Sequence, residues 1–268
     1  MSVITIISDW EKNDFYLSSV KGKILSNNTN TSIIELSNNI NSFSNFETAF
    51  ILKNSYKNFP EQTIHLICVN TLQNKKNNFL LIKYDNHFFI GADNGIFSLI
   101  FDKEPDQIIK LPYLETTFPE LDIFAESANK LINNYDINNI GEQINNYKIK
   151  TISEPFTEDG LLISKIIYFD SYNNAILNVS KDYFKNTVNN QDFEIIVVHS
   201  FNNIIKKIST NYYDVPEFEL FAIFNSIGLL EIGIINGNIK QLFELNINDE
   251  ILIKFGKNIL STSTIQLS

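Results

Sequence analysis

The chain lacks arginine altogether, because each of the 21 basic residues among its 268 is a lysine. The planar guanidinium fork, which binds phosphates and carboxylates through two parallel hydrogen bonds, is therefore missing from its chemistry. The chain also carries 31 acidic residues, and its formal net charge is −10. Nucleic-acid-binding proteins present a basic surface to their partner. Composition and charge together argue against nucleic acid as a partner.

Cysteine and long apolar runs are also scarce. Cys68 is the single cysteine and has no partner for an intramolecular disulfide, which favours a reducing cytoplasm. No uncharged apolar stretch is long enough to span a membrane. The chain opens on the strand-like run Val3–Ile7 instead of a basic segment followed by an apolar one. We therefore expect a cytoplasmic protein without a signal peptide or a membrane anchor.

The three histidines give little sign of chemistry. His65 lies within an apolar run, so we expect a core histidine with satisfied hydrogen bonds, and His87 and His199 are isolated. Without a cysteine cluster or paired histidines, no metal site is expected. The chain also contains neither a glycine-rich phosphate loop nor a nucleophile elbow.

Hydrophobic residues make up 44% of the chain, enough for a sizeable core. In the first half, short apolar runs alternate with segments of helical periodicity, which predicts an α/β domain with a largely parallel central sheet. The expected strands are Val3–Ile7, Ser32–Leu36, Thr63–Asn70, Phe79–Tyr84 and Phe88–Gly91, and the expected helices are Asp14–Leu25, Phe46–Ser55 and Glu120–Ile132.

The Asn-rich segment Asn133–Tyr147 is predicted to be a linker. Beyond it the pattern predicts strands alone, which is typical of a β-barrel or sandwich. We predict two domains, an α/β domain over residues 1–150 and an all-β barrel over 151–268. The strands expected in the second are Leu161–Asp170, Ala175–Val179, Phe193–His199, Phe218–Phe224, Leu229–Ile235 and Ile251–Phe255.

Several polar residues follow predicted strands, where ligands bind in open α/β sheets. Asp9 closes the first strand, and Asp14 stands near the start of the first helix. Taken alone, Asp9 is interpreted as a loop acid and Asp14 as an N-cap. The segments 91–95, 170–174 and 225–228 are likewise interpreted as turns.

Taken together, these segments recur in one order in a known family. They are Ile4-Thr5-Ile6-Ile7-Ser8-Asp9 with Asp14 and Lys21-Gly22, Phe59-Pro60 with Thr63-Ile64-His65, Ala92-Asp93-Asn94-Gly95, Tyr168-Phe169-Asp170-Ser171-Tyr172-Asn173-Asn174 with Asn178, and Phe224-Asn225-Ser226-Ile227-Gly228-Leu229-Leu230-Glu231-Ile232. The chain resembles the S-adenosylmethionine hydroxide adenosyltransferases, relatives of the fluorinating and chlorinating enzymes that use the same substrate. The resemblance covers nearly the whole chain.

The resemblance implies a homotrimer with sites between subunits and S-adenosylmethionine as the substrate, with no cofactor. A carboxylate such as Asp9 would hold the ribose hydroxyls as a double acceptor. The other roles implied for substrate binding are sugar packing by Phe43, binding of the methionine ammonium by Asp14 and Asp170, binding of its carboxylate by Ser226, and contacts to the purine and the reacting centre by Asn174 and Asn94.

The chain departs from the family at the residues thought to activate water. The family aspartate is replaced by Asn70, the histidine by Pro119, and the arginine region reads Lys75-Lys76-Asn77. Asn70 is able to orient a water molecule but not to take its proton. Gln73 and Glu120 stand where the related halogenases carry hydroxyl residues. A carboxylate there disfavours a halide, and Glu120 is interpreted either as a general base or as an acid in the first turn of its helix.

The sequence therefore predicts a hydrolase that converts S-adenosylmethionine to adenosine and methionine with an altered water-activating set, in which Asn70 and Glu120 are the catalytic candidates. The alternative is a family member that binds S-adenosylmethionine or adenosine without catalysis. A third possibility is another nucleoside-processing activity in the same pocket.

Overall fold

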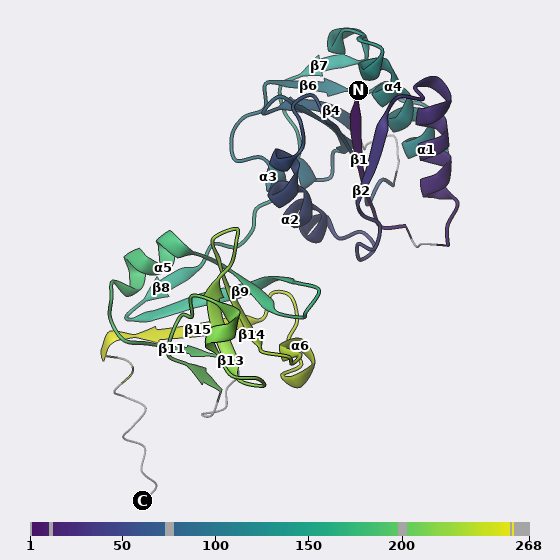
Figure 1. Cartoon of the computed structure of the whole chain (residues 1–268). Coiled ribbons are helices and arrows are strands. Elements are labelled where there is room, and N and C mark those ends of the chain that lie inside the picture. The colour runs from purple at the N-terminus through teal and green to yellow at the C-terminus, as the bar shows by residue number, and fades with distance from the viewer. Residues whose placement is uncertain (1, 11–12, 73–77, 198–202, 258, 260–268) are drawn as a thin grey trace, which may run out of the picture. The chain divides into compact units, whose positions relative to one another are not determined.

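The computed structural model describes residues 2–10, 13–72, 78–197, 203–257 and 259, and the chain folds into two compact units, Met1–Thr151 and Ile152–Ser268 (Figure 1). The first unit contains β1 (Val3–Ser8), α1 (Tyr16–Asn27), β2 (Ser32–Ser37), α2 (Asn45–Ser55), η1 (Tyr56–Asn58), β3 (Ile64–Cys68), β4 (Phe79–Tyr84), β5 (His87–Ala92), α3 (Ile96–Ile100), β6 (Gln107–Lys110), η2 (Glu120–Phe124), α4 (Ala125–Ile132), η3 (Ile137–Asn139) and β7 (Glu142–Ile144).

Seven strands form the sheet of the first unit, in the order β2-β1-β3-β5-β4-β6-β7. The neighbouring strands β2, β1, β3 and β5 are parallel to one another. The remaining pairs, β5 with β4, β4 with β6 and β6 with β7, are antiparallel. The predicted α/β class is confirmed, but the prediction of a largely parallel sheet is wrong because half of its pairings are antiparallel. The cause is local: Asp85 and Asn86 both adopt positive φ, as a tight two-residue hairpin requires, and they reverse the chain between β4 and β5.

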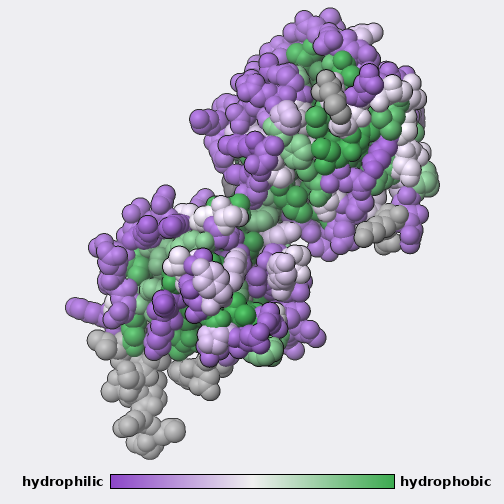
Figure 2. Space-filling view, viewed as in Figure 1, coloured by the Kyte–Doolittle hydropathy of each residue, from purple (hydrophilic) through white to green (hydrophobic). Residues whose placement is uncertain are grey.

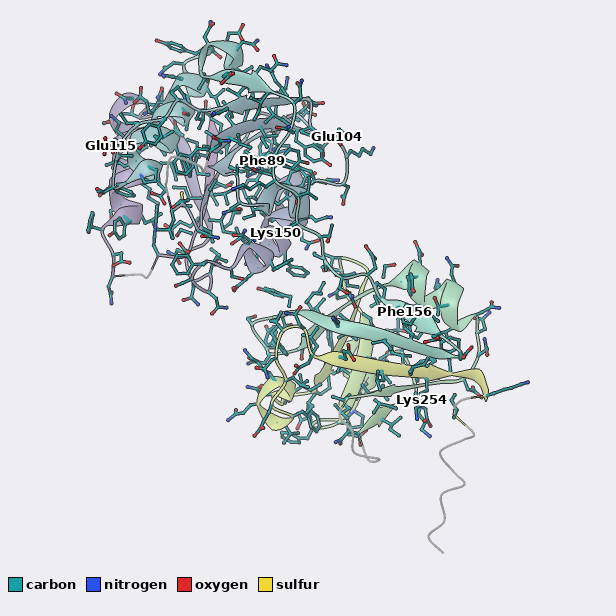
Figure 3. The ribbon with its side chains drawn as sticks, turned by 180° about the vertical axis from the view of Figure 1, so that it is seen from behind. Phe89, Glu104, Glu115, Lys150, Phe156 and Lys254 are labelled. Atoms are coloured by element: carbon teal, nitrogen blue, oxygen red, sulfur yellow. The ribbon has the colours of Figure 1, made fainter. Side chains whose placement is uncertain are left out.

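Helices cover both faces of this sheet (Figure 1). The side chains of a strand alternate between the faces, so Ile6 and Leu66 pack with α1 and α4, while Ile7 and Ile67 pack with α2 and α3. Phe89 lies in the interior of this unit (Figure 3) and is fully buried. Because helices cover both faces of the sheet, the polar loops at the ends of its strands are the part that a ligand reaches.

The segment Asn133–Tyr147 is not the linker that its composition predicts. It contains η3 and β7, and β7 pairs antiparallel with β6 through Ile144 and Ile108. Gly141 permits this pairing, because a Cβ there would lie 2.2 Å from the Lys110 carbonyl oxygen. An edge strand needs few apolar residues, which is why composition alone was misleading.

The second unit is built around an antiparallel sheet in the order β12-β11-β15-β9-β10-β14-β13, with β8 paired to β9. After β12, Ser209 forms a bridge to Ile223 of β13, so the sheet is nearly closed and barrel-like. The elements are β8 (Phe156–Glu158), β9 (Leu161–Phe169), β10 (Ala175–Ser180), α5 (Lys181–Val188), β11 (Phe193–Ile196), β12 (Ile204–Ile205), η4 (Tyr212–Asp214), β13 (Leu220–Phe224), β14 (Leu229–Ile234), α6 (Ile239–Leu242) and β15 (Glu250–Phe255).

The prediction that the second domain contains strands alone is wrong, since α5 and α6 interrupt them. The local signals for α5 are present in the sequence. The Ser180 side chain accepts a hydrogen bond from the Tyr183 N–H and caps the helix, and Asn189 ends it in a left-handed conformation. Phe184 and Val188, four residues apart, both enter the core.

Large hydrophobic side chains are exposed at a limited set of positions. Figure 2 shows hydrophilic residues over much of the visible face of each unit, with hydrophobic ones between them. Phe43 and Leu72 are 60% and 69% exposed in the first unit, and Tyr172 and Tyr213 are 77% and 83% exposed in the second. Each pair lines a pocket of its own unit.

No helix in the described part of the chain combines the length and apolar character needed to cross a membrane.

Candidate active site

A pocket of about 560 Å³ lies in the first unit, where the loops after β1 and β3 meet the segment before η2. β1 and β3 are parallel neighbours, so their carboxyl ends open at the same edge of the sheet. The lining residues are Asp9, Trp10, Tyr16, Phe43, Asn70, Thr71, Leu72, Thr116, Thr117, Phe118, Pro119 and Glu120.

Asp9 connects two loops of this pocket. Its Oδ2 accepts hydrogen bonds from the backbone N–H of Phe43, at 3.0 Å, and of Asn70, at 3.4 Å. Phe43 and Asn70 both have positive φ, of 65° and 51°, which is strained for residues other than glycine. Among the described residues both donors bond to Oδ2, which leaves the lone pairs of the second oxygen for a ligand.

Three asparagines form a hydrogen-bonded network beside Asp9. Asn45 donates to both Asn94 Oδ1 and the Asn94 carbonyl oxygen, each at 3.1 Å. Asn70 donates to Asn45 Oδ1 at 3.3 Å, and Asn94 donates to the Asn70 carbonyl oxygen at 3.1 Å. Asn94 therefore stands behind the pocket wall and holds the Asn70 loop in place. Asn45 was not among the residues predicted from the sequence, because its only local signal is its position at the start of α2.

Glu120 is buried in the pocket wall, with 4% of its surface exposed. The Thr71 hydroxyl, 49 residues away in sequence, donates a hydrogen bond to its Oε1. Burial raises the pKa of the Glu120 carboxyl above its ordinary value, and repulsion from Asp9 acts in the same direction. The hydrogen bonds from Thr71 and from the backbone N–H of Glu120 oppose that rise. Glu120 is thus both a first-turn acid of a π-helical turn and a buried carboxylate in the pocket.

Aromatic rings form one wall of the pocket. Tyr16 and Phe118 pack edge to face with their centroids 5.0 Å apart, and Trp10 lies 6.0 Å from Phe118. Phe15 packs on Tyr16 at 4.5 Å. Such a wall lowers the local polarity, which strengthens electrostatic interactions in the pocket. Neither this aromatic wall nor the hydroxyls of Thr71, Thr116 and Thr117 were predicted from the sequence.

A second pocket, of about 640 Å³, lies in the second unit. Asp170 organises one side of it: its Oδ1 accepts the backbone N–H of Tyr172, at 2.9 Å, and of Asn174, at 2.8 Å. The lining is rich in tyrosine and otherwise largely apolar. It consists of Asp170, Tyr172, Asn174, Tyr212, Tyr213, Phe221, Ile234, Ile235, Asn236 and Gly237.

The predicted site residues are thus distributed over both units. Asp9, Phe43, Asn70 and Glu120 meet in the first pocket, with Asn94 behind it, and Asp170 and Asn174 meet in the second.

Besides Asn94, two predicted residues do not line either pocket. Asp14 is exposed, two residues before α1, and the interpretation of Asp14 as the N-cap is wrong because Phe15 occupies that position. Ser226 is exposed in the turn between β13 and β14. Gln73, the segment Lys75-Lys76-Asn77 and His199 lie outside the described residues.

His65 is a core residue, as the sequence predicts. It is fully buried, with Nδ1 2.7 Å from Thr5 Oγ1 and Nε2 3.2 Å from His87 Nδ1. The prediction that His87 is isolated is therefore wrong. Among the described residues, no group of three His, Cys, Asp or Glu side chains is arranged to hold a metal ion.

The chain combines an α/β unit that has a polar pocket at the ends of parallel strands with a barrel-like unit that has a tyrosine-rich pocket, and both pockets have the size that small-molecule sites have in proteins. Comparison with known families is more specific. The chain belongs to the SAM hydroxide adenosyltransferase family: the N-terminal domain of that family matches residues 4–141, and its C-terminal domain matches residues 164–252. The resemblance seen in the sequence is confirmed.

Individual relatives agree with this family. A (R)-S-adenosyl-L-methionine hydrolase from Methanocaldococcus jannaschii is 26% identical over an alignment of 268 positions, which covers 94% of this chain and 96% of that protein. An uncharacterized conserved protein from Thermotoga maritima has a similar crystal structure, with a TM-score of 0.84, 22% identity, and coverage of 94% of this chain and 99% of that one.

A conserved hypothetical protein from Thermus thermophilus has a TM-score of 0.73 and 18% identity, with coverage of 96% of this chain and 100% of that one. At these identities, the two crystal structures support the fold alone.

Proposed function

We propose that this protein is an S-adenosylmethionine hydrolase, which converts its substrate and water to adenosine and L-methionine. Membership of the family and the hydrolase relative support the substrate. The observation that carries the reaction is the buried Glu120 carboxylate, which lines the same pocket as Asp9. The chain retains a proton acceptor there although Asn70 and Pro119 replace the family aspartate and histidine.

The proposed reaction is a displacement at the ribose C5′. The water oxygen forms a bond to C5′ while the bond from C5′ to the sulfonium sulfur breaks, and its electron pair stays on sulfur as neutral methionine leaves. The water proton passes to the Glu120 carboxylate. A raised pKa makes the ionised carboxylate a stronger base, and the Thr71 hydroxyl holds its orientation. Positioning and desolvation supply the remaining rate enhancement, and the substrate needs no cofactor.

The substrate-binding roles follow the family resemblance. Asp9 would accept the ribose hydroxyls, and Phe43 would pack against the sugar. Asn94 acts indirectly by holding Asn70, whose side chain orients the water. The remaining roles are the methionine ammonium for Asp14 and Asp170, its carboxylate for Ser226 and the purine for Asn174. An acidic protein also attracts the sulfonium and ammonium charges of the substrate.

A non-catalytic binding protein is the second candidate. It is favoured by one observation, namely that Asn70 lines the pocket where the family carries an aspartate. An amide is unable to take a proton from water, so a chain that relied on that position alone would bind its ligand without turnover.

Incubation of the purified protein with S-adenosylmethionine, followed by chromatography of adenosine, separates the two candidates. Adenosine formation above a no-protein control supports the hydrolase. Tight binding by calorimetry without any adenosine contradicts it and favours the binding protein. Formation of a different nucleoside product would point to another activity in the same pocket.

Asp9→Asn is expected to weaken S-adenosylmethionine binding by about 10- to 100-fold, because hydrogen bonds to a charged group contribute about 1.5–3 kcal/mol. The amide keeps the size of the side chain but loses one acceptor oxygen and the charge. Calorimetry measures the change in Kd. Asp182→Asn, at an exposed position of α5, is the matched control and should leave Kd unchanged. Equal Kd values for Asp9→Asn and the wild type would remove Asp9 from the binding site.

We further propose that the protein is cytoplasmic and forms the homotrimer with sites between subunits that the resemblance implies. Light scattering of the purified protein tests the oligomer, and a monomeric mass at the working concentration contradicts it.

A further inference from the structure

Glu231 is a buried carboxylate that has no role in the proposed reaction. It lies in β14 with 3% of its surface exposed. Three groups donate hydrogen bonds to it: Asn174 Nδ2 and the Tyr212 hydroxyl to Oε1, at 3.2 and 3.0 Å, and Asn225 Nδ2 to Oε2, at 3.2 Å. Burying a carboxylate is costly, so a buried acid with three ordered donors calls for a reason beyond packing.

This arrangement determines the orientation of the Asn174 side-chain amide. Its Nδ2 donates to Glu231 Oε1 and also to Asp170 Oδ2, at 3.1 Å. An amide nitrogen carries two hydrogens, and both are therefore committed to carboxylates. Rotating the amide by 180° would point its oxygen at two acceptors. The carboxylates thus fix which end of the amide faces them.

The amide oxygen is left as the hydrogen-bonding group that Asn174 offers to a ligand. Among the described residues, none donates a hydrogen bond to Asn174 Oδ1. A Cβ at residue 233 would lie 2.2 Å from that oxygen and 2.6 Å from the Phe221 ring, so Gly233 provides the space it occupies. Asn174 therefore presents an acceptor, and no donor, to the pocket that it lines.

The pocket itself suits a flat base. Tyr172, Tyr212 and Tyr213 line it together with Phe221, and exposed tyrosine rings provide stacking surfaces for a planar heterocycle. An acceptor at its wall pairs with an exocyclic amine but meets a keto oxygen acceptor to acceptor. A site built to bond a donor rejects a ligand that lacks it, because the buried polar group is left unpaired.

We propose that Glu231 is a positioning residue that fixes the Asn174 amide, so that this pocket selects a 6-aminopurine over a 6-oxopurine. The inference rests on the proposed function for the nucleoside nature of the ligand. It adds a residue and a physical basis for the choice of base.

The test compares adenosine and inosine by calorimetry in the wild type, Glu231→Leu and Glu231→Gln. The wild type should bind adenosine at least about tenfold more tightly than inosine. Glu231→Leu frees one N–H of Asn174 while Asp170 Oδ2 still accepts the other, so the amide is held less firmly. The preference for adenosine should then fall by about threefold or more, the effect of one lost hydrogen bond. Glu231→Gln keeps an oxygen that can accept from Asn174 and should restore most of the ratio. If Glu231 had only a structural role, Glu231→Leu would weaken the binding of both nucleosides alike and leave the ratio of their Kd values unchanged.

Gly233→Ala gives a second test if Glu231→Leu does not fold. The added methyl displaces Asn174 Oδ1, so the preference for adenosine should again fall. The inference is overturned if a folded Glu231→Leu, or Gly233→Ala in its place, keeps the wild-type ratio. It is also overturned if the wild type binds the two nucleosides equally or binds neither. A wild type that prefers adenosine but does not hydrolyse S-adenosylmethionine would contradict the proposed hydrolase and leave this inference standing.

Discussion

Replacing Glu120 with glutamine is expected to lower kcat for S-adenosylmethionine hydrolysis by about 10²- to 10⁴-fold, the range that a positioned general base contributes. The amide keeps the shape of the side chain, and its oxygen still accepts the hydrogen bond from Thr71. What is lost is the lone pair that takes the water proton. Binding of S-adenosylmethionine, measured by calorimetry, should change little because the substitution leaves Asp9 and the second pocket intact.

Two further measurements separate catalysis from a general loss of structure. Glu126→Gln, at a partly exposed acid of α4 that pairs with Lys23, should keep wild-type kcat. In the wild type, kcat should fall on acidification through the pKa of Glu120, which burial raises above its ordinary value, because only the ionised carboxylate accepts a proton. Glu120→Gln should lack that acidic limb. A Glu120→Gln variant with wild-type kcat would exclude Glu120 as the base.

The free energy of unfolding is expected to fall steeply below about pH 6.5 because of His65. Burial lowers the pKa of His65 from its ordinary value of 6.5 to about 3, and the neighbouring His87 acts in the same direction. Between these two values, the unfolded state binds a proton that the folded state does not. Stability from this group is therefore complete above pH 6.5 and is lost as pH falls toward 3, at about 1.4 kcal/mol per pH unit.

Over three pH units this loss amounts to about 4 kcal/mol, a large part of the free energy of unfolding of a typical domain, which is about 5–15 kcal/mol. Urea unfolding of the wild type at a series of pH values measures it. His65→Gln offers an amide to Thr5 but does not titrate. It should lower the free energy of unfolding at neutral pH and reduce its slope against pH by about 1.4 kcal/mol per pH unit, the contribution of one proton. An unchanged slope in His65→Gln would show that other groups cause the acid sensitivity. His65 packs on Phe89 with centroids 4.8 Å apart, so the variant should also be checked for a single unfolding transition.

Much of the fold is readable from particular segments. Val3–Ile7 and Phe79–Tyr84 lie within the observed strands β1 and β4, because continuous apolar runs are typical of buried strands. The predictions were wrong where a few polar residues determined the local structure against the trend of the surrounding composition. Asp85-Asn86 reversed the chain and made the pairing of β4 with β5 antiparallel, and the Asn-rich segment after α4 formed the edge strand β7.

The candidate site was less predictable than the fold. Asp9 and Asn70 follow parallel strands, so their proximity follows from the pattern of the sequence. The links between Asn45, Asn70 and Asn94, and the hydrogen bonds from Asn174 and Tyr212 to Glu231, join residues that are well separated along the chain. No local pattern marks such contacts.

The sequence by itself determined that this is a strongly acidic, arginine-free chain with an α/β half and a mainly β half, and it carried the motifs of the SAM hydroxide adenosyltransferase family. Only the tertiary structure decided that Glu120 is buried beside Thr71 and Asp9, and that Asn174 is held between two carboxylates. The physical reason is that burial and hydrogen bonding set the pKa of a carboxyl and the orientation of an amide, and both depend on residues that are distant in sequence.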